Sequence, residues 1–131
     1  MFTAIKKELA ELTLPGRPQW KLVRNSDAYL RTKKARALFR ALKGKMHLGS
    51  NATYFDYFHE ICHAKQCSEL GLAEYRKLKT YHRELYVFEQ IVKFEHRFTN
   101  EELDEAVKDM LFYESEFGPR SLKFMLNINN H

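Results

Sequence analysis

Two histidines and a glutamate near the middle of the chain have the residue types and spacing of a metal site that hydrolyses peptide bonds. The segment reads His59-Glu60-Ile61-Cys62-His63. Histidines four residues apart project from the same face of a helix, one turn above the other, so both imidazoles can reach one metal ion. Glu60 lies next to His59 around the helix, close enough to accept a proton from a water on that metal. This HExxH pattern predicts His59 and His63 as zinc ligands and Glu60 as the general base.

The surrounding residues predict the helix that this spacing requires. No Pro or Gly falls between Asn51 and Leu70, and Gly71 stands where a helix C-terminus is expected. Apolar side chains recur at spacings of three and four, as on a buried helical stripe, at Tyr54, Tyr57, Phe58, Ile61 and Ala64. Residues 45–48 predict a strand just before the helix. Such a strand has a use, because zinc peptidases commonly pair extended substrate with a sheet edge beside the metal.

A catalytic zinc needs a third protein ligand, and Glu84 is the strongest candidate. It lies in a segment with helical spacing, from Leu72 to about Phe98, on the stripe that also carries Val87, Phe88 and Ile91. A carboxylate on a buried stripe is costly unless it is paired or bound to a metal. Glu89, on the side of Leu85 and Val92, is the alternative. The elongated motif HExxHxxGxxH is excluded, because Gln66 and Glu69 occupy its Gly and third His positions.

The cysteines suggest a second metal hypothesis. A structural zinc would use His59, Cys62, His63 and Cys67, but Cys67 points away from the other three on a regular helix. We expect Cys62 to be a small packed residue and both cysteines to be thiols. The oxyanion of a peptidase also needs a second donor, and four candidates stay open: Tyr81, His82, His96 and Tyr113.

Length and composition predict one globular domain. The chain has 131 residues, of which 44% are hydrophobic. No apolar run approaches the thickness of a bilayer, so no membrane span is expected. The N-terminus predicts an amphipathic helix from Thr3 to about Leu12 and lacks the features of a local signal peptide. We expect a single domain over residues 1–131, with a basic part at 1–44, a core at 45–115 and a tail at 120–131.

The charge is unevenly distributed along the chain. The net charge is +5, yet residues 1–50 carry 12 Lys and Arg against 3 Asp and Glu. Such a basic part could meet nucleic acid, an anionic membrane or an acidic protein. The alternative to an enzyme is therefore a basic binding module, for nucleic acid or an acidic protein partner, in which zinc is only structural.

The remaining segments predict an α+β fold that is mainly helical, with a small sheet beside the HExxH helix. Short strands are expected near Trp20–Val23 and at 45–48. Tyr29 to Leu42 has helical spacing, although Arg36 to Leu42 fits a strand as well. Thr99-Asn-Glu-Glu102 is a capping box that starts a last helix through about Tyr113, and Gly118-Pro119 ends regular structure.

The chain resembles a known family in its central part. The residues that carry the resemblance are Asn51-Ala-Thr, Phe58-His-Glu-Ile-Cys-His-Ala-Lys-Gln66, Leu70-Gly71, Tyr75, Leu78, Arg83-Glu84, Val87, Phe98-Thr, Glu102-Leu103 and Ala106. They resemble the zincin-like metallopeptidase toxin domains at the C-termini of bacterial polymorphic toxins, over roughly residues 45–115. Residues 1–44 do not take part in the resemblance.

The resemblance implies a zinc-dependent, protease-like toxin that is delivered by a specialised secretion system into a target cell and cleaves a protein there. It also implies a dedicated immunity protein, which we expect to be acidic. Carried over by position, His59, His63 and Glu84 are the zinc ligands and Glu60 is the catalytic base.

Overall fold

The computed structural model describes residues 7, 21–33, 35–41 and 44–117, which form two compact units. The first unit ends at Lys77 and the second begins at Leu78. The elements of the first are β1 (Lys21–Arg24), α2 (Asp27–Lys33), β2 (Ala37–Arg40), β3 (Lys45–Leu48), α3 (Tyr54–Leu70) and α4 (Leu72–Lys77). Those of the second are α5 (Thr80–Lys93), the 3-10 helix η1 (Glu95–Arg97) and α6 (Asn100–Phe117). The predicted α+β class, mainly helical with a small sheet, is confirmed.

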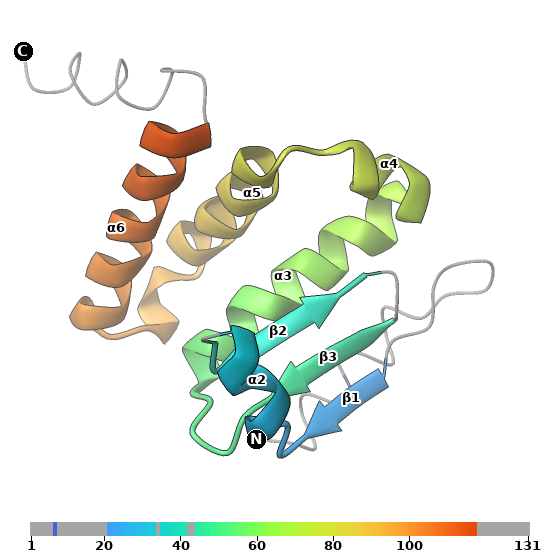
Figure 1. Ribbon diagram of the computed structural model, residues 1–131. Coiled ribbons are helices and arrows are strands. Elements are labelled where there is room, and N and C mark those ends of the chain that lie inside the picture. Colours follow the sequence, from blue (N-terminus) through green and yellow to red (C-terminus); the bar gives the residue numbers. More distant parts are fainter. Residues whose placement is uncertain (1–6, 8–20, 34, 42–43, 118–131) are drawn as a thin grey trace, which may run out of the picture. The chain divides into compact units, whose positions relative to one another are not determined.

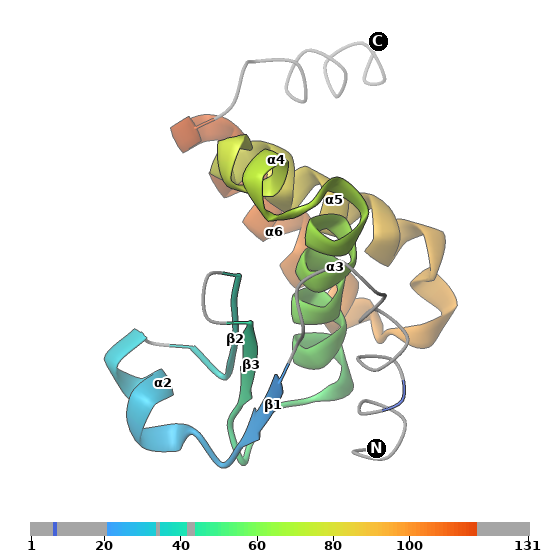
Figure 2. The same ribbon diagram turned by 90° about the vertical axis from the view of Figure 1, so that its right-hand side faces the viewer.

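The sheet has three strands in the order β1-β3-β2, with β3 parallel to β1 and antiparallel to β2. Figure 2 shows α2 and α3 on opposite sides of it. Side chains alternate between the two faces of a strand. In β3, Met46 and Leu48 are almost fully buried and share one face. His47 lies on the other face, where its ring stacks on Tyr29 of α2.

The predicted boundaries hold best where the sequence has strong local signals. The strand at 45–48 is observed as predicted, but as β3 it lies between β1 and β2 and so is not the sheet edge that was expected to pair with substrate. Where a strand near Trp20–Val23 was expected, Lys21–Arg24 forms β1. Within the ambiguous segment from Arg36 to Leu42, Ala37–Arg40 forms the strand β2 and not a helix. The predicted helix from Thr3 to Leu12, the end of regular structure at Gly118-Pro119 and the tail at 120–131 lie outside the described residues.

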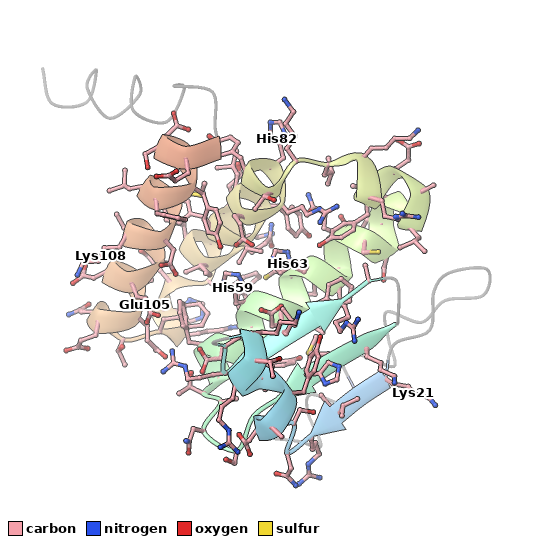
Figure 3. The ribbon with its side chains drawn as sticks, in the orientation of Figure 1. Lys21, His59, His63, His82, Glu105 and Lys108 are labelled. Atoms are coloured by element: carbon pink, nitrogen blue, oxygen red, sulfur yellow. The ribbon has the colours of Figure 1, made fainter. Side chains whose placement is uncertain are left out.

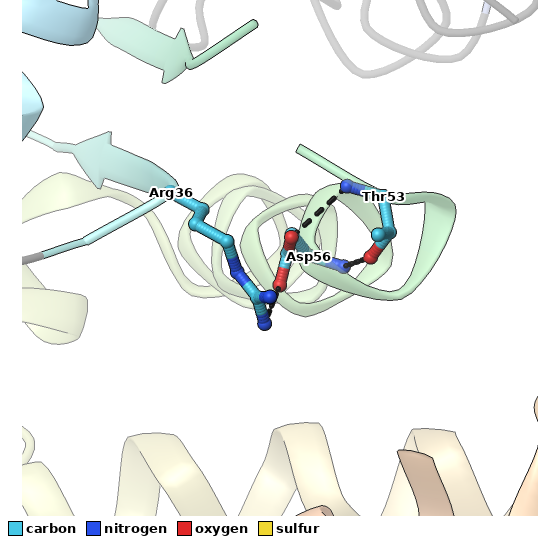
Figure 4. A network of polar contacts seen from close by, with 3 residues as sticks. All are labelled: Arg36, Thr53 and Asp56. Carbon is cyan, nitrogen blue, oxygen red and sulfur yellow. Dashed lines mark hydrogen bonds and ion pairs between the residues drawn. The ribbon is translucent and has the colours of Figure 1, made fainter. Parts of the chain in front are cut away.

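The N-terminus of α3 is fixed by a capping box (Figure 4). The hydroxyl of Thr53 accepts a hydrogen bond from the Asp56 N–H, and the Asp56 carboxylate accepts one from the Thr53 N–H. Asp56 also pairs with Arg36, with Nη2 and Oδ1 3.0 Å apart. At the other end Gly71 has φ 85°, a conformation that favours glycine. The helix that carries the HExxH segment is therefore defined at both ends.

The second unit packs α5 beside α6 (Figure 1). The predicted capping box is present, because Thr99 and Glu102 exchange side chain to main chain hydrogen bonds of 2.9 and 3.1 Å. The buried side chains are Tyr81, Val87 and Ile91 of α5 and Ala106, Met110 and Glu114 of α6. The last helix runs to Phe117, beyond the predicted Tyr113. None of the described helices combines the length and the apolar character that crossing a bilayer requires.

His47 is a buried histidine whose surroundings disfavour its charged form. Its Nδ1 lies 3.0 Å from the Ser26 hydroxyl, and its Nε2 is buried with no hydrogen-bond partner among the described residues. Burial lowers the pKa of His47 below its ordinary value of 6.5, and the nearby Arg40 and Lys45 lower it further. The folded protein therefore disfavours a proton that the unfolded chain accepts.

We expect His47 to make the protein less stable in mild acid. The pKa of this residue is lower in the folded than in the unfolded state. Its contribution to the free energy of unfolding is therefore present above pH 6.5 and is lost as the pH falls towards the folded-state pKa. The measurement is the thermal midpoint between pH 7.5 and about pH 5. On acidification, the thermal midpoint of unfolding should fall less in His47→Gln than in wild type. In His96→Gln, an exposed control, it should fall as much as in wild type. Equal drops in wild type and His47→Gln would contradict this assignment.

Candidate metal centre

The helix α3 brings His59 and His63 together. Their ring centroids are 5.1 Å apart and the rings are inclined by 64°. His59 is partly exposed, whereas only 8% of the His63 surface is accessible. Figure 3 shows the two side chains next to each other on α3. The pair thus offers two imidazoles from consecutive turns of one helix.

The chemistry of this donor pair fits zinc. Imidazole nitrogen is a common zinc ligand, and a catalytic site needs three protein ligands and an open position. Cys62 and Cys67 are both buried thiols, as predicted. Neither belongs to any group of three or more potential metal ligands among the described residues. The described part of the chain therefore gives no support to a structural zinc that uses these cysteines.

Glu60 lies between the two histidines in sequence and is tied to the sheet. Its Oε2 accepts a hydrogen bond from the main-chain N–H of Phe39 in β2, with N and O 2.9 Å apart. The side chain is partly buried. Sequence reasoning missed Phe39, because nothing in the spacing of a motif reveals which main-chain group meets it across 21 residues.

Glu84 and Glu89 differ in their surroundings within the second unit. Both lie on α5, where Glu84 shares a side with the buried Val87 and Ile91 and is itself partly buried. Glu89 is exposed. A ligand carboxylate is more readily held in place on the partly buried side, so the local environment favours Glu84 over Glu89.

The four candidate oxyanion donors all lie in the second unit. Tyr81 is buried and makes an edge contact with the ring of His82, which is exposed. His96 is exposed on η1, and Tyr113 is partly buried on α6, where it packs against Phe112.

A family model described as metallopeptidase toxin 4 matches residues 3–116. No curated protein and no solved structure gives a significant match to the chain.

Proposed function

Because the chain belongs to the metallopeptidase toxin 4 family, we propose that it is a zinc-dependent peptidase whose centre is built on α3. The observation that carries this proposal is the pair His59 and His63, with ring centroids 5.1 Å apart and Glu60 between them in sequence. Metal ligands on one helical face with an adjacent carboxylate are what a hydrolytic zinc site needs.

His59, His63 and Glu84 would be the zinc ligands. The two histidines come from consecutive turns of α3, and Glu84 comes from the partly buried side of α5. Two imidazoles and one carboxylate form a known ligand set of catalytic zinc, which leaves a fourth position open. Glu84 is favoured over Glu89 because Glu89 is exposed.

Zinc, Glu60 and an oxyanion donor would have separate roles in the reaction. When bound, zinc supplies a Lewis acid that polarises the scissile carbonyl and lowers the pKa of the attacking water. Glu60 takes the proton from that water and passes it to the leaving amine, so that one carboxylate acts first as base and then as acid. A second donor to the oxyanion would come from Tyr81, His82, His96 or Tyr113.

The family also supports a proposal for the biological setting of this activity. The activity would serve as a toxin that a specialised secretion system delivers into a target cell, with a protein of that cell as substrate. A dedicated immunity protein would neutralise it in the producing cell. An acidic immunity protein would match the basic part of the chain, since residues 1–50 carry 12 Lys and Arg against 3 Asp and Glu.

Removing one histidine tests this function. Wild type should contain one zinc per chain and hydrolyse an unfolded protein such as casein, whereas His63→Ala should lose most of the metal and the activity, because two ligands no longer suffice. Metal analysis by mass spectrometry and a casein assay measure both. Cys62→Ala, a matched change of another buried residue on α3, should keep its zinc. A wild-type protein that stays metal-free when purified with added zinc would refute the proposal.

A further inference from the structure

Glu60 accepts a hydrogen bond from a main-chain group at the outer edge of the sheet. β2 is the last strand in the order β1-β3-β2. The N–H of Phe39 does not join the ladder with β3 but points to the Glu60 Oε2, 2.9 Å away. An edge strand presents a row of such unused main-chain groups. Here the helix α3 uses one of them to hold a side chain.

A strand amide is a rigid anchor for a flexible side chain. A glutamate loses rotamer entropy when it is fixed in one conformation. A general base must nevertheless be held close to its working geometry, within about 0.5 Å. The Phe39 N–H is itself fixed, because Phe39 is paired with Met46 across the sheet. A hydrogen bond to a carboxylate is also stronger than one between neutral groups.

We propose that the main-chain N–H of Phe39 is the positioning group for Glu60, holding its carboxylate in the orientation in which it works as a base. This inference rests on the proposed function, in which Glu60 is that base. A carboxylate has about four acceptor sites, and one N–H uses one of them. This bond by itself therefore does not prevent the Glu60 carboxylate from accepting a proton from water.

The side chain of Phe39 has a different role from its N–H. The ring is partly exposed and makes an edge contact with Tyr75 of α4, with centroids 6.1 Å apart. That contact helps to pack the first unit. The N–H and the ring can thus be removed one at a time, which separates positioning of Glu60 from packing.

The test compares two changes at this one residue in the full chain. Replacing Phe39 by phenyllactic acid turns its amide into an ester, which keeps the ring and removes the N–H. Phe39→Ala keeps the N–H and removes the ring. Three-bond NMR couplings report whether the Glu60 side chain occupies one rotamer, and zinc content and casein hydrolysis are measured alongside.

The ester variant should show an averaged Glu60 rotamer, unchanged zinc content and a kcat lowered by roughly 10- to 100-fold at similar KM, the size expected for a hydrogen bond to a charged group. Phe39→Ala should keep the ordered rotamer and most of kcat. If Glu60 is equally ordered in the ester variant and in wild type, the positioning role is overturned, whatever the activity. If wild type cleaves nothing while Glu60 loses order in the ester, the proposed function fails and the positioning role stands.

Discussion

Exchanging Glu60 for Gln is expected to lower peptidase activity by about 100- to 10,000-fold, the usual contribution of a general base, while zinc stays bound. Gln has the same shape, and its amide oxygen can still accept the hydrogen bond from the Phe39 N–H. It cannot take a proton from water, so only proton transfer is lost. The measurements are kcat/KM on casein and zinc content of the same preparation.

The matched control for this change is Glu69→Gln, on an exposed turn of the same helix. It should keep both zinc and activity. In cells, Glu60→Gln should no longer inhibit growth when expressed without an immunity protein. Full toxicity of that variant would rule out the proteolytic mechanism.

The second large effect is expected at Glu84. Loss of a residue that only hydrogen-bonds to a zinc ligand weakens zinc binding by up to about 100-fold. Loss of a ligand itself should weaken zinc binding by more than that. Glu84→Ala should therefore lose zinc and Glu89→Ala should retain it. Five residues apart on a helix, the two carboxylates point about 140° from each other, so only one can face the histidine pair. Titration with a zinc-sensitive dye measures both affinities.

Each outcome of this comparison has a clear meaning. The opposite result would move the ligand to Glu89 and leave the zinc peptidase intact. If both variants bound zinc normally, neither glutamate would be a ligand, and His82 or His96 would be the next to test.

Local signals explain what the sequence could predict. Thr99 and Glu102 form the predicted capping box through hydrogen bonds between near neighbours, so the sequence could indicate where α6 starts. Thr53 and Asp56 form a box of the same kind at the start of α3, which was not predicted. Gly71 marks the end of α3 through its positive φ. His59 and His63 lie on the same face of α3 because of the helical repeat alone. Their proximity could therefore be predicted as soon as the helix itself was predicted.

The parts that the sequence could not predict depend on contacts between distant residues. The sequence from Arg36 to Leu42 fits a helix or a strand. Ala37–Arg40 is a strand because it pairs with β3. The segment from Leu72 to Phe98 breaks after Lys77, although no Gly or Pro marks the break. The hydrogen bond from Phe39 to Glu60 joins residues 21 positions apart through a main-chain group, which carries no residue-type signal.

The central claim, that this chain is a metallopeptidase with Glu60 as its base, is tested most directly by labelling new protein N-termini in a bacterial extract. Zinc-loaded wild type should create a discrete set of new N-termini that mass spectrometry identifies, and Glu60→Gln with the same zinc content should create none of them. The account would be contradicted if wild type produced no new N-termini, or if the two proteins produced the same set.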